Sequence, residues 1–365
     1  MHRPTAKGLA ILSACFLSAL TAGATGELAT KKISLKEVDT WGYQLQNVRS
    51  RFVPKDKFDI LVVDYSRNGT DERAFKSTAV DLMRKRAGQP DRIILAYLSI
   101  GEAEAYRYYW KPSWIEKAND ALAEPTVSSS TSDSGLLKPI EAGKAPVGFR
   151  GALNGEAAIG TDNSAPLARL SQAAPIWLAA ENPAWRGNHL VRYWDAEWQA
   201  IIFGSPNAYL DKIIDAGFDG VYLDKIDSND DWQASRPTAE RDMVDFVKRL
   251  AAHARGRKPG FLIVPQNGEE LLEFKDYVQT IDAIAKEDML FGGGRLKDGD
   301  PNPRSEIIKA KRHLEKALRA GRKVFAVEYL DNIDQIIEAR KRLLGLGYVP
   351  NFARRALDET PIIRD

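Results

Sequence analysis

Seven acidic residues stand at or just past the ends of short apolar runs that we interpret as strands. They are Asp64, Glu102, Asp195, Asp224, Asp227, Glu287 and Glu328. If these strands are parallel members of one barrel, their C-terminal ends converge on one mouth, and carboxylates far apart in the sequence become neighbours. Neighbouring carboxylates repel each other, so one stays protonated near neutrality while another is ionised. Glycoside hydrolysis requires such a combination of an acid with a base or nucleophile.

Aromatic residues accompany these acids and offer flat apolar faces on which sugar rings can stack. They are Tyr65, Tyr97, Tyr106, Tyr108, Tyr109, Trp110, Tyr193, Trp194, Tyr222 and Tyr329. The acids also have structural interpretations. Asp64 and Asp227 stand where a carboxylate often caps the following turn or helix, and Glu102 and Glu328 have basic neighbours for rim salt bridges. Binding of Mg²⁺ or Ca²⁺ is a further alternative, but the chain has no compact DxDxDG ligand string.

The elements that must position these residues alternate between apolar runs and segments of helical period. The runs are 41–45, 58–65, 92–98, 189–195, 220–224, 261–267, 281–287 and 323–329. The helical segments are 70–87, 206–216, 238–254, 305–320 and 334–344, and a small extra strand is expected at 348–352. Apolar strands alternating with helices indicate a parallel sheet covered on both faces. We predict an α/β fold, a (β/α)8 TIM barrel, as a single domain over residues 33–355.

One segment, about 119–175, has no convincing period and is dominated by Gly, Ala, Pro and Ser. Loops of this length are usually functional or disordered. The segment follows the third strand, on the side where barrel active sites form. It is therefore either a lid or a tolerated low-complexity insertion at the surface.

The N-terminus has the charged, apolar and small-residue zones of a secretory signal peptide over residues 1–24, with cleavage expected after Ala24. The apolar run 8–20 is too short for a permanent membrane anchor. Residues 12–15 also resemble a bacterial lipobox, in which Cys15 would be lipidated. The sequence predicts a secreted or periplasmic protein, or alternatively a lipoprotein attached to a membrane through Cys15.

Composition excludes several classes of protein. The 365 residues include 52 Lys and Arg against 50 Asp and Glu, so no basic field favours nucleic acid. One cysteine and four histidines, without an HxxxH or HExxH pair, exclude a disulfide framework and argue against a metal centre. No GxGxxG or GxxxxGK[ST] string follows an early strand, so we expect no nucleotide cofactor.

Several strings in the chain form a recognisable set: 41–46 (WGYQLQ), 64–66 (DYS), 96–104 (AYLSIGEAE), 108–110 (YYW), 217–227 (GFDGVYLDKID) and 327–329 (VEY). Together they resemble glycoside hydrolase family 114, typified by endo-α-1,4-polygalactosaminidases. The resemblance covers about residues 41–352. It implies a TIM-like barrel that cleaves inside α-1,4-linked galactosamine polymers. It also implies a catalytic pair that matches Asp224, on the fifth predicted strand, and Glu287, on the seventh.

Three positions depart from the residues that this family often has. Lys225 stands where Asn is common, Gln266 where Lys is common, and Asp288 where Gln or Cys is common. Lys225 and Gln266 either exchange one positive charge between neighbouring strands or indicate a different sugar. The sequence leaves both interpretations open.

We expect Asp224 and Glu287 to supply the acid/base and the nucleophile, in an order that the sequence leaves open. The residues expected to line the sugar subsites are Asp64, Tyr65, Tyr97, Glu102, Tyr222, Asp227, Asn267 and Glu328. An acidic cleft would attract an amino-sugar polymer with free amines, because ammonium groups are drawn to unpaired carboxylates. The competing hypotheses are a carbohydrate-binding barrel without catalysis and a metal-dependent hydrolase with the same mouth. No metal, other cofactor or stable protein partner is expected.

Overall fold

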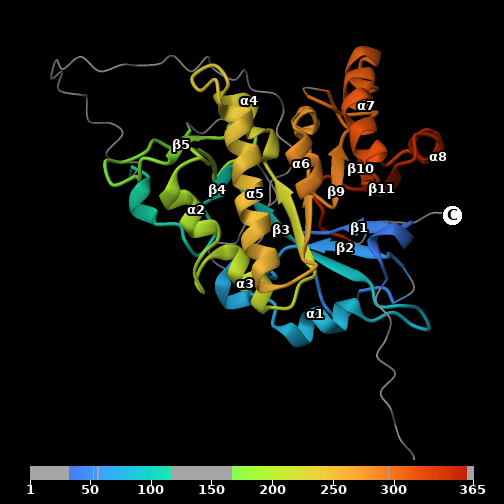
Figure 1. Cartoon of the computed structure of the whole chain (residues 1–365), viewed down its shortest axis with the longest axis horizontal. Helices are drawn as coiled ribbons and strands as arrows, with labels where there is room; N and C mark the ends of the chain where they lie inside the picture. The colour runs from blue at the N-terminus through green and yellow to red at the C-terminus, as the bar shows by residue number, and fades with distance from the viewer. Residues whose placement is uncertain (1–32, 52, 56, 117–166, 295, 360–365) are drawn as a thin grey trace, which may run out of the picture. The chain divides into compact units, whose positions relative to one another are not determined.

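The computed structural model describes residues 33–359, apart from positions 52, 56 and 295 and the segment 117–166. In this part of the chain, eight parallel strands form the centre of the fold, with helices around them (Figure 1). The strands are β1 (Trp41–Tyr43), β2 (Ile60–Val63), β3 (Ile93–Ser99), β7 (Gly220–Asp224), β8 (Leu262–Pro265), β9 (Ala283–Glu287), β10 (Lys323–Tyr329) and β11 (Val349–Ala353).

Backbone ladders join these strands in the order in which they occur in the chain. One ladder runs β1-β2-β3-β7-β8 and a second runs β9-β10-β11, and a parallel bridge between Gln266 and Ala285 links the two. β11 returns to β1, where the indole nitrogen of Trp41 donates to the Val349 carbonyl at 2.9 Å. The predicted (β/α)8 fold is confirmed in this strand order, in which all C-terminal strand ends face one side.

Helices connect most successive strands and cover their outer face. These helices include α1 (Ser77–Arg84), α5 (Ala239–Arg257), α6 (Lys275–Thr280), α7 (Arg304–Arg319) and α8 (Ile333–Gly345). Three further helices lie within the connections on either side of β7: α2 (Ala196–Ile202), α3 (Tyr209–Asp215) and α4 (Asn229–Trp232). Single 3-10 turns are η1 (Leu35–Glu37), η2 (Asp71–Arg73), η3 (Pro112–Trp114), η5 (Ile226–Ser228) and η6 (Glu269–Glu273). In α5, Met243, Val247, Leu250 and Ala254 recur at helical spacing and are all buried, which explains its orientation.

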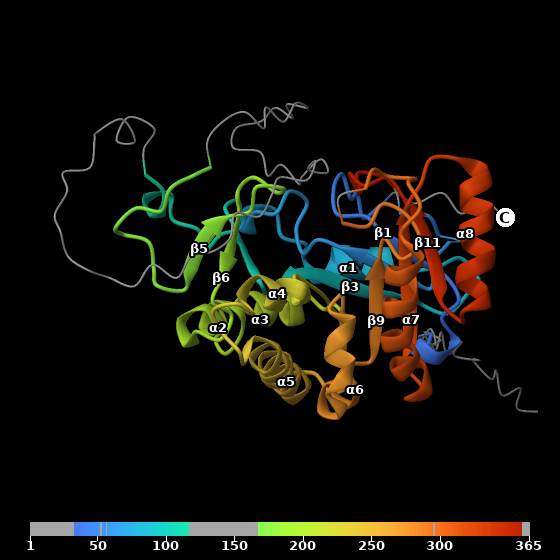
Figure 2. The same ribbon diagram turned by 90° about the horizontal axis from the view of Figure 1, so that it is seen from above.

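A second, antiparallel sheet lies within the long connection between β3 and β7. It consists of β4 (Glu102–Glu104), β5 (Leu178–Glu181) and β6 (Asn188–Val191), in the order β4-β6-β5. Figures 1 and 2 both place β5 at the opposite end of the described domain from α7 and α8. This sheet forms one wall of the site described below.

The prediction that residues 189–195 form the fourth barrel strand is wrong. Residues 188–191 are β6 of the antiparallel sheet, and β3 pairs directly with β7. An apolar run predicts a strand but not the strand with which it pairs. Because residues 189–195 do not contribute a barrel strand, each later barrel strand is numbered one lower than predicted. Asp224 therefore ends the fourth barrel strand and Glu287 the sixth, and the segment expected to be a small extra strand is the eighth, β11.

The barrel interior is filled by alternate residues of each strand, because successive side chains of a strand point to opposite faces. Ile60 and Val62 of β2 point inward, whereas Leu61 and Val63 pack against the helices. In β10, Phe325, Val327 and Tyr329 point inward. This alternation decides which residues at the strand ends reach the mouth.

The predicted signal peptide, residues 1–24, lies outside the described residues, as does most of the predicted insertion at 119–175. The described end of that insertion pairs with the rest of the domain: Leu170 forms an antiparallel bridge with Ile115, and the Ser171 amide donates to the Trp114 carbonyl at 2.8 Å. Among the described helices, none has the length and apolar character needed to cross a membrane.

Candidate active site

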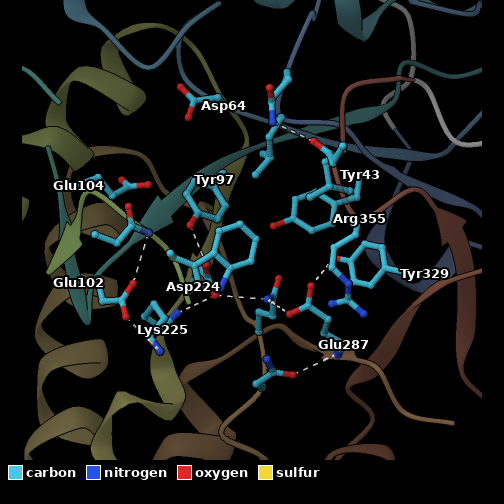
Figure 3. Close-up of a pocket in the computed structure, with 18 of the residues that line it drawn as sticks. Tyr43, Asp64, Tyr97, Glu102, Glu104, Asp224, Lys225, Glu287, Tyr329 and Arg355 are labelled. Atoms are coloured by element: carbon cyan, nitrogen blue, oxygen red, sulfur yellow. Dashed lines mark hydrogen bonds and ion pairs between the residues drawn. The ribbon is translucent and has the colours of Figure 1, made fainter. Parts of the chain in front are cut away.

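Asp224 and Glu287 lie on one pocket at the C-terminal ends of the parallel strands (Figure 3). Asp224 ends β7 and Glu287 ends β9, and Gln266, which follows the intervening strand β8, connects them. The amide nitrogen of Gln266 donates to Asp224 Oδ1 at 3.2 Å and to Glu287 Oε2 at 2.8 Å. Because both oxygens bond to one nitrogen, they are at most about 6 Å apart, the sum of the two bonds.

Each carboxylate also accepts a hydrogen bond from a tyrosine hydroxyl. Tyr97 donates to Asp224 Oδ2 at 2.6 Å, and Tyr329 donates to Glu287 Oε1. Asp224 Oδ1 accepts a third bond, from the backbone amide of Lys225 at 2.7 Å. Protein donors thus fix the orientation of both carboxylates before any substrate binds.

The environment of the pair raises the pKa of both carboxyl groups to near neutral pH. Burial, together with the charge of Glu287, raises the pKa of Asp224 to about 7. Burial and the adjacent Asp288 raise the pKa of Glu287 to about 7, against the opposing effects of Tyr329 and Arg355. Because the pKa of each acid is about 7, either group can hold a proton or be ionised near neutral pH, as an acid paired with a base or nucleophile requires.

Each of the three side chains that make up this bridge is followed by a residue in the left-handed conformation. These residues are Lys225 (φ 60°), Asn267 (φ 58°) and Asp288 (φ 52°). A non-glycine residue in this region costs roughly 1 kcal/mol or more and persists only where its surroundings require it. Here the chain turns sharply away directly after the inward-pointing acid or amide. Asn267 also holds the next strand, since its Oδ1 accepts from the Glu287 amide at 3.1 Å.

The antiparallel sheet supplies a second charged group, centred on Glu102 of β4. Glu102 accepts from Asn182 at 2.7 Å and pairs with Lys225 Nζ at 3.3 Å. β4 can lie this close to β7 because Gly101 precedes it: a Cβ at Gly101 would be 2.2 Å from the Lys225 carbonyl oxygen and 2.0 Å from Ser228 Oγ. Glu102 is therefore engaged with protein donors inside the pocket.

A buried cation, Arg107, joins the barrel to the antiparallel sheet. Its guanidinium lies 2.8 Å from Asp64, which follows β2, and 2.7 Å from Glu104 of β4. Asp64 and Glu104 both line the pocket, but their charges are directed at Arg107. These two carboxylates therefore stabilise the wall of the pocket through their ion pairs with Arg107.

The opposite wall is closed by Arg355, which follows β11. Its guanidinium forms a bidentate ion pair with Asp288 at 2.8 and 3.0 Å and lies 4.1 Å from the centre of the Tyr329 ring. Arg355 therefore holds both the residue that follows Glu287 and the tyrosine that donates to it.

The pocket brings together five of the eight residues that we expected to line subsites: Asp64, Tyr97, Glu102, Asp227 and Asn267. The other three, Tyr65, Tyr222 and Glu328, do not line it, and for them the expectation is corrected. Strand alternation explains two of the three. Tyr65 is one position out of phase with Asp64 and packs outward against Tyr209, with ring centres 4.7 Å apart.

Glu328 is out of phase in the same way, since Val327 and Tyr329 point inward. It is buried, and its carboxylate accepts from the backbone amides of Leu290 and Phe291 at 2.8 and 3.2 Å. Glu328 thus fixes the loop that follows the Glu287 strand.

Tyr222 does point inward, but one layer below the mouth. It lies beneath the pocket between the rings of Tyr43 and Trp41, whose centres are 5.0 and 6.1 Å away. Asp195, which the strand-end pattern also selected, caps α2 by accepting from the Glu197 amide at 2.8 Å.

The structure adds pocket residues that were not predicted as site residues. They include Tyr43, Glu104, Tyr106, Trp185, Arg186, Asn188, Gln266, Tyr329 and Arg355. For Tyr329 the sequence held a usable signal, because it is in phase with Val327 on a strand that ends at the mouth. For Arg186 and Arg355 no comparable signal exists, since both belong to loops. In the described residues, no group of three or more His, Cys, Asp or Glu side chains is arranged to hold a metal ion.

Paired acids at the C-terminal mouth of a (β/α)8 barrel, lined with aromatic and polar groups, define the class of barrel glycoside hydrolases. The sequence model of glycoside-hydrolase family GH114 matches residues 161–364. The chain is 31% identical over 340 residues to an uncharacterized protein of Thermotoga maritima, a match that covers 89% of this chain and 84% of that protein. A protein of Methanocaldococcus jannaschii is also 31% identical, over 87% of this chain and 77% of that protein. The chain belongs to glycoside-hydrolase family GH114.

Among solved structures, the glycoside hydrolase domain of PelA from Pseudomonas aeruginosa is similar, with a TM-score of 0.51 and 18% sequence identity. The match covers 89% of this chain and 98% of that domain. At this identity the similarity concerns the fold, and it agrees with the barrel described above.

Proposed function

We propose that this glycoside hydrolase cleaves internal α-1,4 linkages in a galactosamine-containing polysaccharide, with Asp224 and Glu287 as its two catalytic carboxylates. The observation that carries the proposal is the pair itself. Two half-buried acids, both with pKa raised to about 7, lie on one pocket and share the amide of Gln266. The family supports hydrolysis of a glycosidic bond, and the choice of polymer rests on the sequence resemblance.

The spacing of the pair favours retention of anomeric configuration. Retaining enzymes have carboxyl groups about 5–5.5 Å apart, whereas inverting enzymes need about 6.5–9.5 Å to admit a water molecule. The upper limit of about 6 Å between the bridged oxygens fits the first class. One carboxylate would then attack the anomeric carbon while the other protonates the departing oxygen, and water would hydrolyse the glycosyl-enzyme ester in a second step.

Hydrogen bonding distinguishes the two roles. Asp224 accepts three bonds from the protein, including one from a backbone amide, and donors of this kind favour the ionised form. Glu287 accepts two such bonds in addition to lying beside Asp288. We therefore assign Asp224 as the nucleophile and Glu287 as the acid/base.

The test is a reducing-end assay on a panel of hexosamine polymers, followed by NMR of the first product formed. We expect cleavage of an α-1,4 galactosamine polymer and release of the α anomer. An initial β anomer would contradict the retaining assignment, and absence of cleavage across the panel would contradict the substrate class. Azide added to a Glu287→Gly variant should restore turnover and yield a glycosyl azide of retained configuration, whereas an azide of inverted configuration would exchange the two roles.

A further inference from the structure

The ammonium group of Lys225 belongs to the pocket that holds the proposed catalytic pair. Lys225 directly follows Asp224, and its side chain lines the same pocket and is 22% exposed (Figure 3). Its Nζ is 3.3 Å from Glu102 and 3.9 Å from Asp227. Burial alone would lower the pKa of Lys225, but these carboxylates raise it above its ordinary value, so the group is charged at neutral pH.

Three of the carboxylates that would attract a substrate ammonium on this side of the pocket are already engaged, and the fourth, Asp227, lies 3.9 Å from Lys225 Nζ. Glu102 pairs with Lys225, and Asp64 and Glu104 direct their oxygens at Arg107. A free amine on the sugar would have to displace Lys225 from Glu102 in order to bind there. The expectation that the acidic mouth favours free amines assumed unpaired carboxylates, a condition that these three residues do not meet.

The ammonium group of Lys225 also favours some substituents on the sugar nitrogen over others. An ammonium group has three donors and no acceptor, so two ammonium groups cannot form a hydrogen bond and repel each other. Acylation of the sugar nitrogen removes its charge and adds a carbonyl oxygen, to which Lys225 Nζ can donate. A pocket can gain specificity by such a mismatch with the unwanted substrate as much as by contacts with the correct one.

We propose that Lys225 makes the subsite beside Asp224 selective for an N-acylated hexosamine over one with a free amine. This inference rests on the proposed function, because it names the form of amino sugar that the catalytic pair receives. Lys225 acts here as a specificity-determining residue, separate from the two carboxylates that do the chemistry.

The experiment compares kcat/KM on two α-1,4 galactosamine polymers of matched length, one N-acetylated and one de-N-acetylated. We expect the wild type to prefer the acetylated polymer by about tenfold or more, and Lys225→Asn to lower that ratio at least about tenfold. Asn is neutral and tolerates the left-handed backbone at this position. Because both polymers are cleaved by the same Asp224, any effect of the substitution on its pKa cancels in the ratio.

Three control variants separate local charge from other causes. Lys225→Arg keeps the charge and should keep the preference, and Lys225→Gly is a second neutral variant that suits the backbone. Arg319→Gln removes an exposed cation of α7, paired with Glu315 at 2.9 Å outside the pocket, and should leave the ratio unchanged.

Wild-type cleavage of the free-amine polymer at an equal or higher kcat/KM would overturn the inference while leaving the proposed function intact. An unchanged ratio in folded Lys225→Asn and Lys225→Gly would also overturn it. Cleavage of neither polymer by the wild type would overturn the proposed function and the inference together.

Discussion

At the scale of single residues, the proposed chemistry depends on two carboxylates, Asp224 and Glu287, whose pKa values the protein raises. Asp224→Asn and Glu287→Gln each remove a carboxyl group that we propose as nucleophile or acid/base, while preserving the shape of the side chain. We expect each to lower kcat by about 10³-fold or more, with a circular dichroism spectrum equal to that of the wild type. Asp227→Asn, at the rim of the same pocket, is the matched control and should act mainly on KM. Near-normal turnover in either paired variant would exclude that residue from the chemistry.

Tyr329 provides a test of the acid/base assignment through pH. Its hydroxyl bond lowers the pKa of Glu287, so Tyr329→Phe should raise that pKa. If Glu287 holds the catalytic proton, the alkaline limb of the kcat/KM profile moves to higher pH, and kcat falls because the carboxyl is less well oriented. Tyr97→Phe removes the equivalent bond to Asp224 and should displace the acid limb instead. Unchanged limbs in both variants would show that the hydroxyls do not control the pair.

The same raised pKa values make stability depend on pH. The pKa of Asp224 is near its ordinary 3.8 in the unfolded chain and about 7 in the folded one. Between these values the folded state holds a proton that the unfolded state releases, so the free energy of unfolding falls as pH rises from about 4 to 7. Asp224→Asn does not titrate at this position, and we expect its stability relative to the wild type to improve by about 4 kcal/mol across that window, since each pKa unit corresponds to about 1.4 kcal/mol. Urea unfolding at pH 4.5 and 8 measures this, and parallel changes in both proteins would contradict it.

At the scale of elements, the site depends on the attachment of the antiparallel sheet to the barrel. Arg107 makes this attachment by pairing with Asp64 from the barrel and Glu104 from β4, with all three side chains buried. Arg107→Met would leave two buried carboxylates without a counter-charge, which typically costs about 3–5 kcal/mol. Thermal or urea unfolding at pH 7 should show this loss. The control is Arg319→Met in α7, an ion pair whose arginine is 75% exposed, which should change stability by less than about 1 kcal/mol.

Strand phase explains which strand-end residues reach the pocket. Asp64 and Tyr329 are in phase with the inward-facing residues of β2 and β10, whereas Tyr65 and Glu328 are each one position out of phase. Whether a residue lies near a strand end predicted its place in the pocket less well than whether its side chain faces the barrel interior or the helices. If we had applied this alternation of inward and outward side chains to the sequence, it would have excluded Glu328 and selected Tyr329.

At the scale of the whole molecule, we propose that the chain is exported, because charged, apolar and small residues occur in that order over positions 1–24. Intact-mass measurement of the protein from its native host should show a new N-terminus at Thr25, or a lipid-modified N-terminus at Cys15. A soluble cytosolic form that retains Met1 would contradict export. This prediction is independent of the catalytic ones, since none of the described pocket residues lies before Tyr43.

Local patterns in the sequence were sufficient for the fold class, because apolar runs of strand length alternating with helices indicate a parallel sheet covered by helices. The same patterns placed seven acids at strand ends, and only the resemblance to a known family implied Asp224 and Glu287 as the pair among them. The sheet to which residues 189–195 belong could not be predicted from such patterns, because the hydrogen-bond partners of a strand are distant in sequence. Whether each acid is free or paired with a basic group could not be predicted either. Whether a carboxylate is free or engaged depends on groups such as Arg107 and Lys225, which only the folded chain brings within about 3 Å.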